Sequence, residues 1–231
     1  MKPSQVAPLL QAMLAIHRPV MLWGPPGVGK SDLVHQVGVF TEHDVWEMRL
    51  SIMDPTEVKG ILFPNTKTKE ANWFFPDTLP KKGKGILFLD EINTAPPAVQ
   101  AAAYQLVLNR RLGEYVLPKD WRIVAAGNRM GDRGVTYAMP SPLANRFIHL
   151  DLDPDLDDWC LWAMKNGVAN ENIAFLRFKP DLLHKFDPAT NPRAFPSPRT
   201  WVFVDEVSKL NLPPALEFEA VKGAVGEGPA S

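Results

Sequence analysis

The most constraining feature of this sequence is the stretch Gly-Pro-Pro-Gly-Val-Gly-Lys-Ser at residues 24–31. It fits a pattern of Gly, four residues of any kind, then Gly-Lys followed by Ser or Thr, which is typical of phosphate-binding loops. Glycines let the backbone turn its N–H groups toward phosphate oxygens. The apolar run 19–23 before the loop predicts a buried strand, and residues 31–40 after it have the spacing of a helix. The competing interpretation is a glycine turn with no ligand.

The loop predicts a nucleoside triphosphate and a divalent cation as ligands, and we expect ATP and Mg²⁺. The Lys30 ammonium would reach the β- and γ-phosphates, and the Ser31 hydroxyl would bind Mg²⁺. The positive end of the helix dipole adds to the attraction for phosphate. The residues of this stretch that we expect to contact the nucleotide are Gly24, Pro25, Pro26, Gly27, Val28, Gly29, Lys30, Ser31 and Asp32.

A second informative stretch, residues 85–91, is an apolar run that ends in two acids. A buried parallel strand delivers such carboxylates to the carboxyl edge of its sheet. We expect Asp90 to join the nucleotide and metal contacts, holding Mg²⁺ through water, and Glu91 to orient and deprotonate the attacking water. The alternative is that the two acids only end a buried strand. Residues 121–127 predict another strand, after which Asn128 would hydrogen-bond the attacking water or the γ-phosphate, or occupy a turn.

The composition excludes several classes of protein. The 231 residues carry 25 Lys and Arg against 26 Asp and Glu, so no overall basic charge attracts nucleic acid or an anionic membrane. Cys160 is the only cysteine, which excludes an internal disulfide, fits a reducing compartment and predicts a small core residue. The apolar residues 6–16 predict a helix rather than a signal peptide, and no run reaches the length of a membrane span. We therefore expect a cytoplasmic protein.

A shift to acids and proline near residues 153–158 predicts a boundary between an α/β nucleotide-binding domain, 1–152, and a smaller helical domain, 153–231. Residues 51–80 predict an insertion with a helix that begins at 54–57 and a short strand at 72–76. Residues 223–231 predict a flexible end. The other predicted elements are strands at 44–50 and 148–152, a hairpin that begins near 109–114, a short helix at 140–146, and helices at 98–108, 156–165, 170–186 with a break at proline, 200–210 and 213–222.

Five motifs arrive in an order that resembles an AAA+ ATPase, and most closely the MoxR family. They are GPPGVGKS at 24–31, LDEIN at 89–93, AAGN at 125–128, ANRF at 144–147 and PSPR at 196–199. The resemblance covers about residues 9–222. It implies a three-layer α/β P-loop core with a parallel sheet in the order 5-1-4-3-2, a small α-helical lid, and nucleotide bound between them at a subunit interface.

The same match implies roles for single residues. Lys30 and Ser31 correspond to Walker A, Asp90 and Glu91 to Walker B, Asn128 to sensor 1, Arg146 to the arginine finger and Arg199 to sensor 2. An arginine just before the last strand cannot easily fold back onto its own nucleotide, so we expect Arg146 to act on a neighbour's nucleotide in a homo-oligomeric ring, a hexamer by resemblance. An ordinary salt bridge is the alternative for Arg146 and Arg199. Further interface candidates, or plain surface charges, are Arg110, Arg111, Arg129 and Arg133.

The resemblance implies an ATP hydrolase whose turnover remodels or activates a protein target, often with a partner that carries a von Willebrand A domain. One alternative is a nucleic-acid motor for DNA transposition, restriction or translocation, against which the neutral charge argues. Another is an assembly scaffold gated by nucleotide with weak turnover, against which Glu91 and Arg146 argue. Compared with what the resemblance implies, the helical part is short at its carboxyl end, so we expect a lid without its final segment and no extra domain after it. The target would therefore be recognised by the insertions, 54–64 and 111–117, or by a separate partner.

Overall fold

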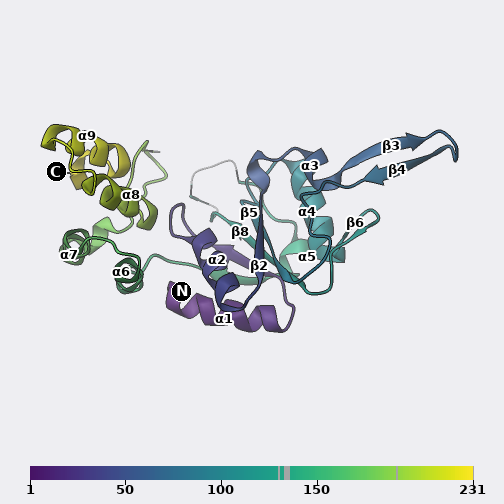
Figure 1. The fold of residues 1–231 in the computed structure, drawn as a ribbon, viewed down its shortest axis with the longest axis horizontal. Helices are drawn as coiled ribbons and strands as arrows, with labels where there is room; N and C mark the ends of the chain where they lie inside the picture. The colour runs from purple at the N-terminus through teal and green to yellow at the C-terminus, as the bar shows by residue number, and fades with distance from the viewer. Residues whose placement is uncertain (130, 133–135, 191, 231) are drawn as a thin grey trace.

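Five parallel strands form the central sheet of the molecule in the computed structural model, which describes residues 1–129, 131–132, 136–190 and 192–230 (Figure 1). From one edge to the other the strands are β2 (Asp44–Arg49), β5 (Gly85–Asp90), β8 (Trp121–Gly127), β1 (Val20–Trp23) and β9 (Ile148–Asp151). Counted in chain order, this is the expected order 5-1-4-3-2 read from the opposite edge. Because neighbouring strands pair in parallel, their carboxyl ends share one edge.

The inner strand β5, between β2 and β8, is buried on both faces. Ile86 and Phe88 pack in a cluster with side chains of α1 (Pro3–Ala15) and α2 (Lys30–Phe40). Leu87 and Leu89 pack in a second cluster with side chains of α4 (Pro97–Asn109). Successive side chains of a strand point to opposite faces, so these two clusters are the two halves of one core. The fold is therefore a three-layer α/β sandwich, as the resemblance implied.

The insertion after β2 begins as predicted and then departs from the prediction. A short 3-10 turn, η1 (Leu50–Ile52), leads to α3 (Pro55–Lys59), whose first turn is capped by the Asp54 carboxylate, which accepts from the Thr56 N–H at 2.9 Å. Beyond α3, the chain forms a hairpin of β3 (Ile61–Asn65) and β4 (Glu70–Phe74) that projects away from the sheet (Figure 1). The predicted strand at 72–76 is present as β4, which begins and ends two residues earlier, whereas its antiparallel partner β3 was not predicted.

The predicted hairpin near 109–114 and the elements that follow it are confirmed. The strands β6 (Arg111–Leu112) and β7 (Tyr115–Val116) pair antiparallel directly after α4. A short helix, α5 (Ser141–Ala144), precedes β9 at the edge of the sheet. These elements place the turn that carries Arg146 between α5 and β9.

The carboxyl-terminal part is helical and has a hydrophobic cluster of its own. Its elements are α6 (Leu156–Lys165), α7 (Asn170–Phe178), η2 (Pro180–Leu182), α8 (Pro198–Ser208), α9 (Pro214–Val225) and α10 (Glu227–Ala230). Trp159, Cys160 and Trp201 are buried in the cluster, and Cys160 is a core residue as predicted. Val225 is buried there as well, so the expectation of a flexible end from residue 223 was wrong. The separate cluster supports the proposed division into 1–152 and 153–231.

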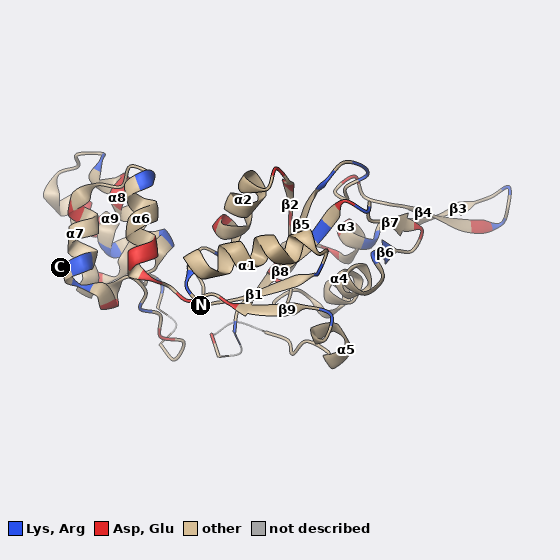
Figure 2. Ribbon diagram, turned by 90° about the horizontal axis from the view of Figure 1, so that it is seen from below, with Lys and Arg blue, Asp and Glu red and all other residues tan. Residues whose placement is uncertain are grey.

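The outer surface of the described chain carries both signs of charge. Figure 2 shows Lys and Arg interspersed with Asp and Glu along the helices and loops. Among the described residues, no helix combines the length and the apolar character that crossing a membrane would need. The distribution of charge bears on the choice of a target, which is discussed below.

Candidate nucleotide site

The glycine-rich loop joins the carboxyl end of β1 to the amino end of α2, as the sequence predicted. Gly27 and Gly29 have φ angles of 77° and 95°, in the left-handed region that favours glycine. A Cβ at Gly27 would also lie 2.6 Å from the Ser197 hydroxyl oxygen. The loop therefore needs glycine for its own bend and for the close approach of the segment before α8.

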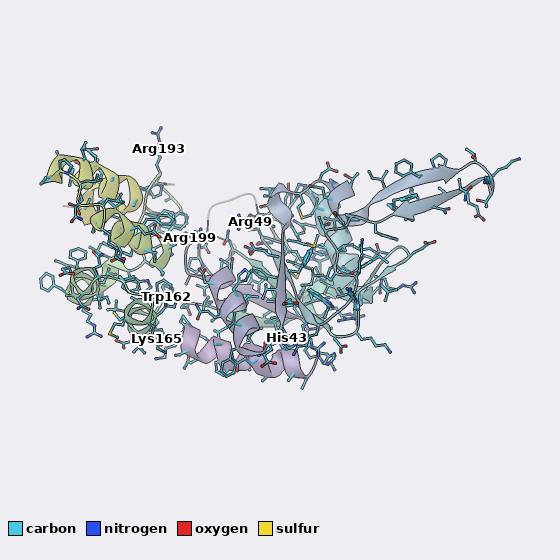
Figure 3. All side chains as sticks on the ribbon, viewed as in Figure 1. His43, Arg49, Trp162, Lys165, Arg193 and Arg199 are labelled. Carbon is cyan, nitrogen blue, oxygen red and sulfur yellow. The ribbon has the colours of Figure 1, made fainter. Side chains whose placement is uncertain are left out.

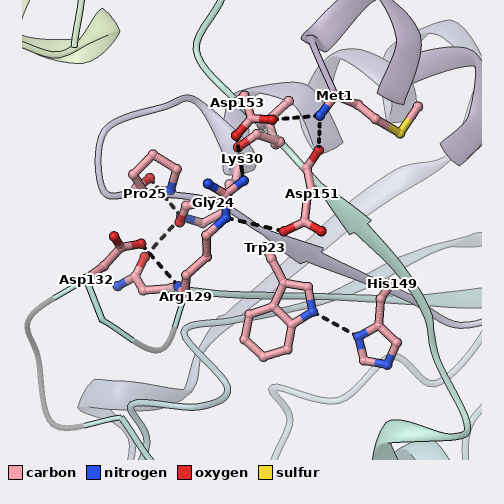
Figure 4. Close-up of polar contacts among 12 residues, drawn as sticks. Met1, Trp23, Gly24, Pro25, Lys30, Arg129, Asp132, His149, Asp151 and Asp153 are labelled. Atoms are coloured by element: carbon pink, nitrogen blue, oxygen red, sulfur yellow. Dashed lines mark hydrogen bonds and ion pairs between the residues drawn. The ribbon is translucent and has the colours of Figure 1, made fainter.

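Lys30 ties this loop to the end of β8. Its ammonium donates to the Gly24 carbonyl at 2.7 Å, the Pro25 carbonyl at 3.2 Å and the Asn128 side-chain oxygen at 3.0 Å (Figure 4). Burial lowers the pKa of Lys30 to about 8, although the nearby Asp90 carboxylate acts in the opposite direction. The predicted phosphate ligand is thus a partly desolvated cation, whose attraction for an anion is stronger than in water.

Asp90 and Ser31 meet at the same edge of the sheet. The Ser31 hydroxyl donates to the Asp90 carboxylate at 3.0 Å, and Asp90 is almost fully buried at the end of β5. Burial raises the pKa of Asp90, and the hydrogen bond from Ser31 partly offsets this. A carboxylate and a hydroxyl side by side suit Mg²⁺, which binds oxygen ligands and keeps several waters and phosphate oxygens. Among the described residues, no group of three or more His, Cys, Asp or Glu side chains could hold a metal.

Glu91 follows β5 in an unusual backbone conformation. Its φ of 56° is left-handed, which is rare for a residue other than glycine, asparagine or aspartate. Its carboxylate accepts a hydrogen bond from the Ser51 hydroxyl, which lies in η1 just after β2. We did not predict this role for Ser51, and its signal was its position at the end of the strand that pairs with β5. The Glu91 carboxylate is therefore held by a hydroxyl from the segment that follows the neighbouring strand.

A second unpredicted partner, Asn93, holds Asn128 in place. The Asn93 amide nitrogen donates to the Asn128 carbonyl at 2.8 Å, and its oxygen accepts from the Asn128 N–H at 3.2 Å. Asn93 is only 2% exposed. Its signal in the sequence was its place two residues after Glu91, within the motif that carries both acids. The Asn128 side chain is thereby aimed at Lys30 by a buried amide.

The helical part reaches the loop through three residues. The His184 Nε2 lies 3.0 Å from the Pro26 carbonyl, the Arg199 N–H donates to the Gly27 carbonyl at 3.3 Å, and Ser197 caps α8 beside Gly27. Arg199 stands at the start of α8 and its side chain lines the cavity at the loop, as Figure 3 allows the reader to follow. The remaining residues that line this cavity are Pro26, Gly27, Val28, Gly29, Lys30, Ser31, Asp90, Glu91, Gly127 and Asn128.

The predicted residues that do not line the cavity fall into two groups. Gly24 and Pro25 take part through the carbonyls that bind Lys30, while Asp32 is exposed on the first turn of α2. Arg146 is exposed on the turn after α5 and is not among the lining residues. One cavity is thus lined by Lys30, Asp90, Glu91, Asn128 and Arg199, while Arg146 lies outside it.

The other arginines expected at an interface differ from one another. Arg129 forms ion pairs with Asp151 at 3.3 Å and Asp153 at 2.6 Å (Figure 4). Arg110 donates to the backbone carbonyls of residues 118 and 121, and Arg111 is an exposed residue of β6. Arg133 lies outside the described residues. The contacts of Arg110 and Arg129 are within the chain, so an ordinary structural role accounts for both.

A comparison with known protein families decides the class of this chain. Residues 19–147, more than half of the sequence, match the family model described as AAA domain, dynein-related subfamily. The chain belongs to this family. The matched range begins just before β1 and ends just before β9, so this AAA domain contains the loop, both Walker B acids and Asn128.

Individual relatives agree with this assignment. Midasin from Giardia intestinalis is 26% identical over 149 residues, which is 61% of this chain but 3% of that protein's length. An ATPase candidate from Cytophaga hutchinsonii has a similar structure, with a TM-score of 0.53, 15% identity, and coverage of 97% of this chain and 81% of that chain. The RuvB Holliday junction branch migration motor of Thermotoga maritima gives a TM-score of 0.52 at 19% identity, covering 99% and 66% of the two chains. At these identities the structural matches establish a shared fold.

Proposed function

We propose that this AAA domain binds ATP with Mg²⁺ and hydrolyses it to ADP and phosphate. The observation that carries the proposal is the convergence of Lys30, Ser31, Asp90, Glu91 and Asn128 on one cavity at the carboxyl edge of the sheet. In open parallel α/β sheets, ligands bind at this edge. A buried cation, a carboxylate with a hydroxyl, and a second carboxylate that lines the same cavity are the groups that phosphoryl transfer needs.

The roles follow from the charge that develops on the transferring phosphoryl group. Lys30 would leave the loop carbonyls and bind the phosphates, with the loop N–H groups around them. Ser31 and Asp90 would hold Mg²⁺, which neutralises phosphate charge when it is bound. Glu91 would accept a proton from the attacking water, and Asn128 would orient that water or the γ-phosphate. Arg199 would reach the phosphates from the helical part.

We further propose that the active unit is a homo-oligomeric ring, hexameric by its resemblance to MoxR proteins. Arg146 is exposed and outside its own cavity, so a neighbour's γ-phosphate is its proposed ligand. An arginine supplied in trans is worth about 10³ to 10⁵ in rate in related reactions. The helical part has exposed apolar side chains that contacts between subunits would bury. They include Leu161, Met164, Phe178 and Phe203.

The proposed target is a protein, remodelled or activated in the manner of MoxR-type ATPases together with a separate partner, for which the resemblance suggests a von Willebrand A domain. The β3–β4 hairpin supports this choice because it projects from the core with Ile61, Leu62, Phe63 and Phe74 exposed. Apolar side chains of this kind suit a polypeptide more than a phosphate backbone. The interspersed charges of Figure 2 likewise offer no basic surface for nucleic acid in the described chain.

Replacing the proposed base tests the hydrolysis. Glu91→Gln should leave the affinity for ATP within about threefold and lower turnover by about 10² to 10⁴, because the amide cannot take a proton. Binding is measured with a fluorescent ATP analogue, and turnover by phosphate release. Glu206→Gln, an exposed glutamate on α8, is the matched control and should behave as the wild type. Unchanged turnover in Glu91→Gln would reject Glu91 as the base.

A further inference from the structure

An uninterrupted set of hydrogen bonds joins the strand before the loop to the turn that carries Arg146. The Trp23 indole N–H donates to His149 Nδ1 at 2.8 Å (Figure 4). The other ring nitrogen, Nε2, lies 2.8 Å from the Ala144 carbonyl. The two rings are nearly parallel, with an interplanar angle of 9°. Phe147 adds an edge contact to the imidazole, with ring centroids 6.3 Å apart. His149 is therefore held on three sides although it is exposed.

The partners fix the tautomer of His149. An indole N–H can only donate, so Nδ1 must carry a lone pair. A carbonyl can only accept, so Nε2 must carry the proton and donate to Ala144. The imidazole thus acts as a neutral bridge with one acceptor and one donor, and each end has a chemically matched partner.

The ends of this bridge lie at informative places in the fold. Trp23 is the last residue of β1 and directly precedes Gly24 of the loop. Ala144 is the last residue of the short helix α5, two residues before Arg146. The Ala144 carbonyl also accepts from the Phe147 N–H at 3.2 Å, and the Arg146 N–H donates to the Leu143 carbonyl at 2.9 Å. His149 therefore reaches the backbone turn that sets the direction of Arg146.

Arg146 needs such support because nothing else in the described chain fixes its side chain. No hydrogen bond or ion pair joins the Arg146 side chain to another described residue, so the support that the described chain gives Arg146 comes through its backbone turn. That turn follows a helix of four residues, which is too short to be rigid by itself. An anchor on β1, a strand paired with both β8 and β9, supplies the rigidity.

We propose that His149 is a positioning residue for Arg146, coupling the loop strand of one subunit to the arginine that this subunit offers to its neighbour. The proposal rests on the proposed function, in which Arg146 acts in trans. It assigns His149 an effect on the neighbour's nucleotide rather than on its own. A residue that merely stabilises the fold would behave differently. Its loss would impair the subunit's own nucleotide site as much as the neighbour's site that receives Arg146.

Mixed rings can isolate the two directions. Lys30→Ala subunits have no working loop but keep Arg146, and Arg146→Ala subunits have a working loop but no finger. Turnover restored by mixing them comes from interfaces at which the first kind completes the site of the second. His149→Phe, which keeps a ring and removes both nitrogens, is placed once in the Lys30→Ala subunit and once in the Arg146→Ala subunit. Phosphate release is measured for each mixture, and the assembly of each by gel filtration.

We expect restored turnover to fall about ten- to a hundredfold when His149→Phe is in the finger-bearing subunit, because small misplacements of a catalytic group have effects of this size. When His149→Phe is in the Arg146→Ala subunit, the restored turnover should change by less than about twofold. His149→Gln in the finger-bearing subunit should recover part of the rate, since its amide can still donate to a carbonyl. The control is His43→Phe, a histidine before β2 whose ring nitrogen contacts only Thr41.

Trp23→Phe in the finger-bearing subunit provides a second variant that does not depend on the folding of His149→Phe. It removes only the indole N–H and should also lower the restored rate. The proposed role of His149 would be overturned if His149→Phe lowered the restored turnover equally in the Lys30→Ala and Arg146→Ala subunits. It would also be overturned if neither His149→Phe nor Trp23→Phe lowered the turnover when placed in the Lys30→Ala subunit. Both results would leave the action of Arg146 in trans standing. No restored turnover in the parental mixture would overturn the action of Arg146 in trans and, with it, the proposal.

Discussion

Asn93 is almost entirely buried, and both ends of its amide are occupied by the backbone of Asn128. Removing that amide leaves a backbone N–H and a carbonyl without their partner at the centre of the site. An unsatisfied buried group costs about 1–3 kcal/mol. The same loss lets the Asn128 side chain move away from the position at which it meets Lys30.

We therefore predict that Asn93→Ala lowers the free energy of unfolding by about 1–3 kcal/mol, as measured by urea titration. Turnover should fall more than ATP affinity does, because Asn128 acts on the water or the γ-phosphate in the proposed mechanism. Asn109→Ala, at the exposed end of α4, is the matched control and should change neither quantity. Wild-type stability in Asn93→Ala would show that water replaces the amide.

The site residues that the sequence predicted lie in local motifs, whereas those that it missed reach the site only through the pairing of strands. Lys30, Ser31 and Asp90 stand in local patterns whose spacing fixes their neighbours, so the pattern alone predicted that they meet. Ser51 and Asn93 contact the site through the pairing of β2 with β5 and of β5 with β8. A single serine or asparagine at a strand end carries no distinctive spacing, so only the assembled sheet reveals its partner.

At the level of helices and strands, the sequence predicted what an amphipathic pattern or a cap encodes. The strand 121–127 and the helix 156–165 have the predicted bounds, and α3 begins after Asp54, as predicted, with Gly60 at its carboxyl end. The β3–β4 hairpin was half missed because its apolar side chains are exposed, so burial imposes no alternation on them. The end of α9 was missed because Val225 is buried by helices that are distant in sequence.

Asp205 connects α8 to the amino-terminal end of α7. Its carboxylate accepts from the Ala169 N–H at 2.7 Å, the Asn172 amide at 3.0 Å and the Lys209 ammonium at 2.5 Å. Burial alone would raise the pKa of Asp205, but these hydrogen bonds outweigh it and lower the pKa. A carboxylate with a lowered pKa in the folded state contributes stability above its ordinary pKa of about 4, and this stability is lost as the pH falls through the folded value.

Accordingly, Asp205→Asn should lower the unfolding free energy at pH 7 by about 1–3 kcal/mol, since the amide loses charge-assisted bonds. The difference from the wild type should shrink as the pH falls below about 4, where the wild-type carboxylate also becomes neutral. Urea unfolding at pH 7 and near pH 3 measures both values. Asp157→Asn, an exposed residue on α6, should match the wild type at both pH values. A difference that grows toward acid pH would contradict the assignment.

Considered together, the sheet and the helical part meet at the loop through Pro26 and Gly27, and the proposed nucleotide would lie at this junction. Arg199 belongs to the helical part and lines the cavity next to Lys30, whose pKa its positive charge helps to lower. Two cations directed at one cavity repel each other until an anion binds between them. A bound triphosphate would therefore turn an unfavourable contact between the two parts into a favourable one.

This reversal gives Arg199 a measurable signature. Without nucleotide, Arg199→Ala should melt at the wild-type temperature or slightly above it, because the side chain is exposed and removing it relieves repulsion. With ATP at about 100 times the wild-type Kd, the wild type should gain about 2.7 kcal/mol, whereas a variant bound about tenfold more weakly should gain about 1.4 kcal/mol. Thermal melts of the Glu91→Gln background, with and without ATP, measure these gains without turnover. Arg193→Ala, whose side chain points away from the molecule in Figure 3, should keep the full gain. If Arg199→Ala gains as much as the wild type, Arg199 does not bind the phosphates, and the proposed contact of the helical part with the nucleotide is rejected.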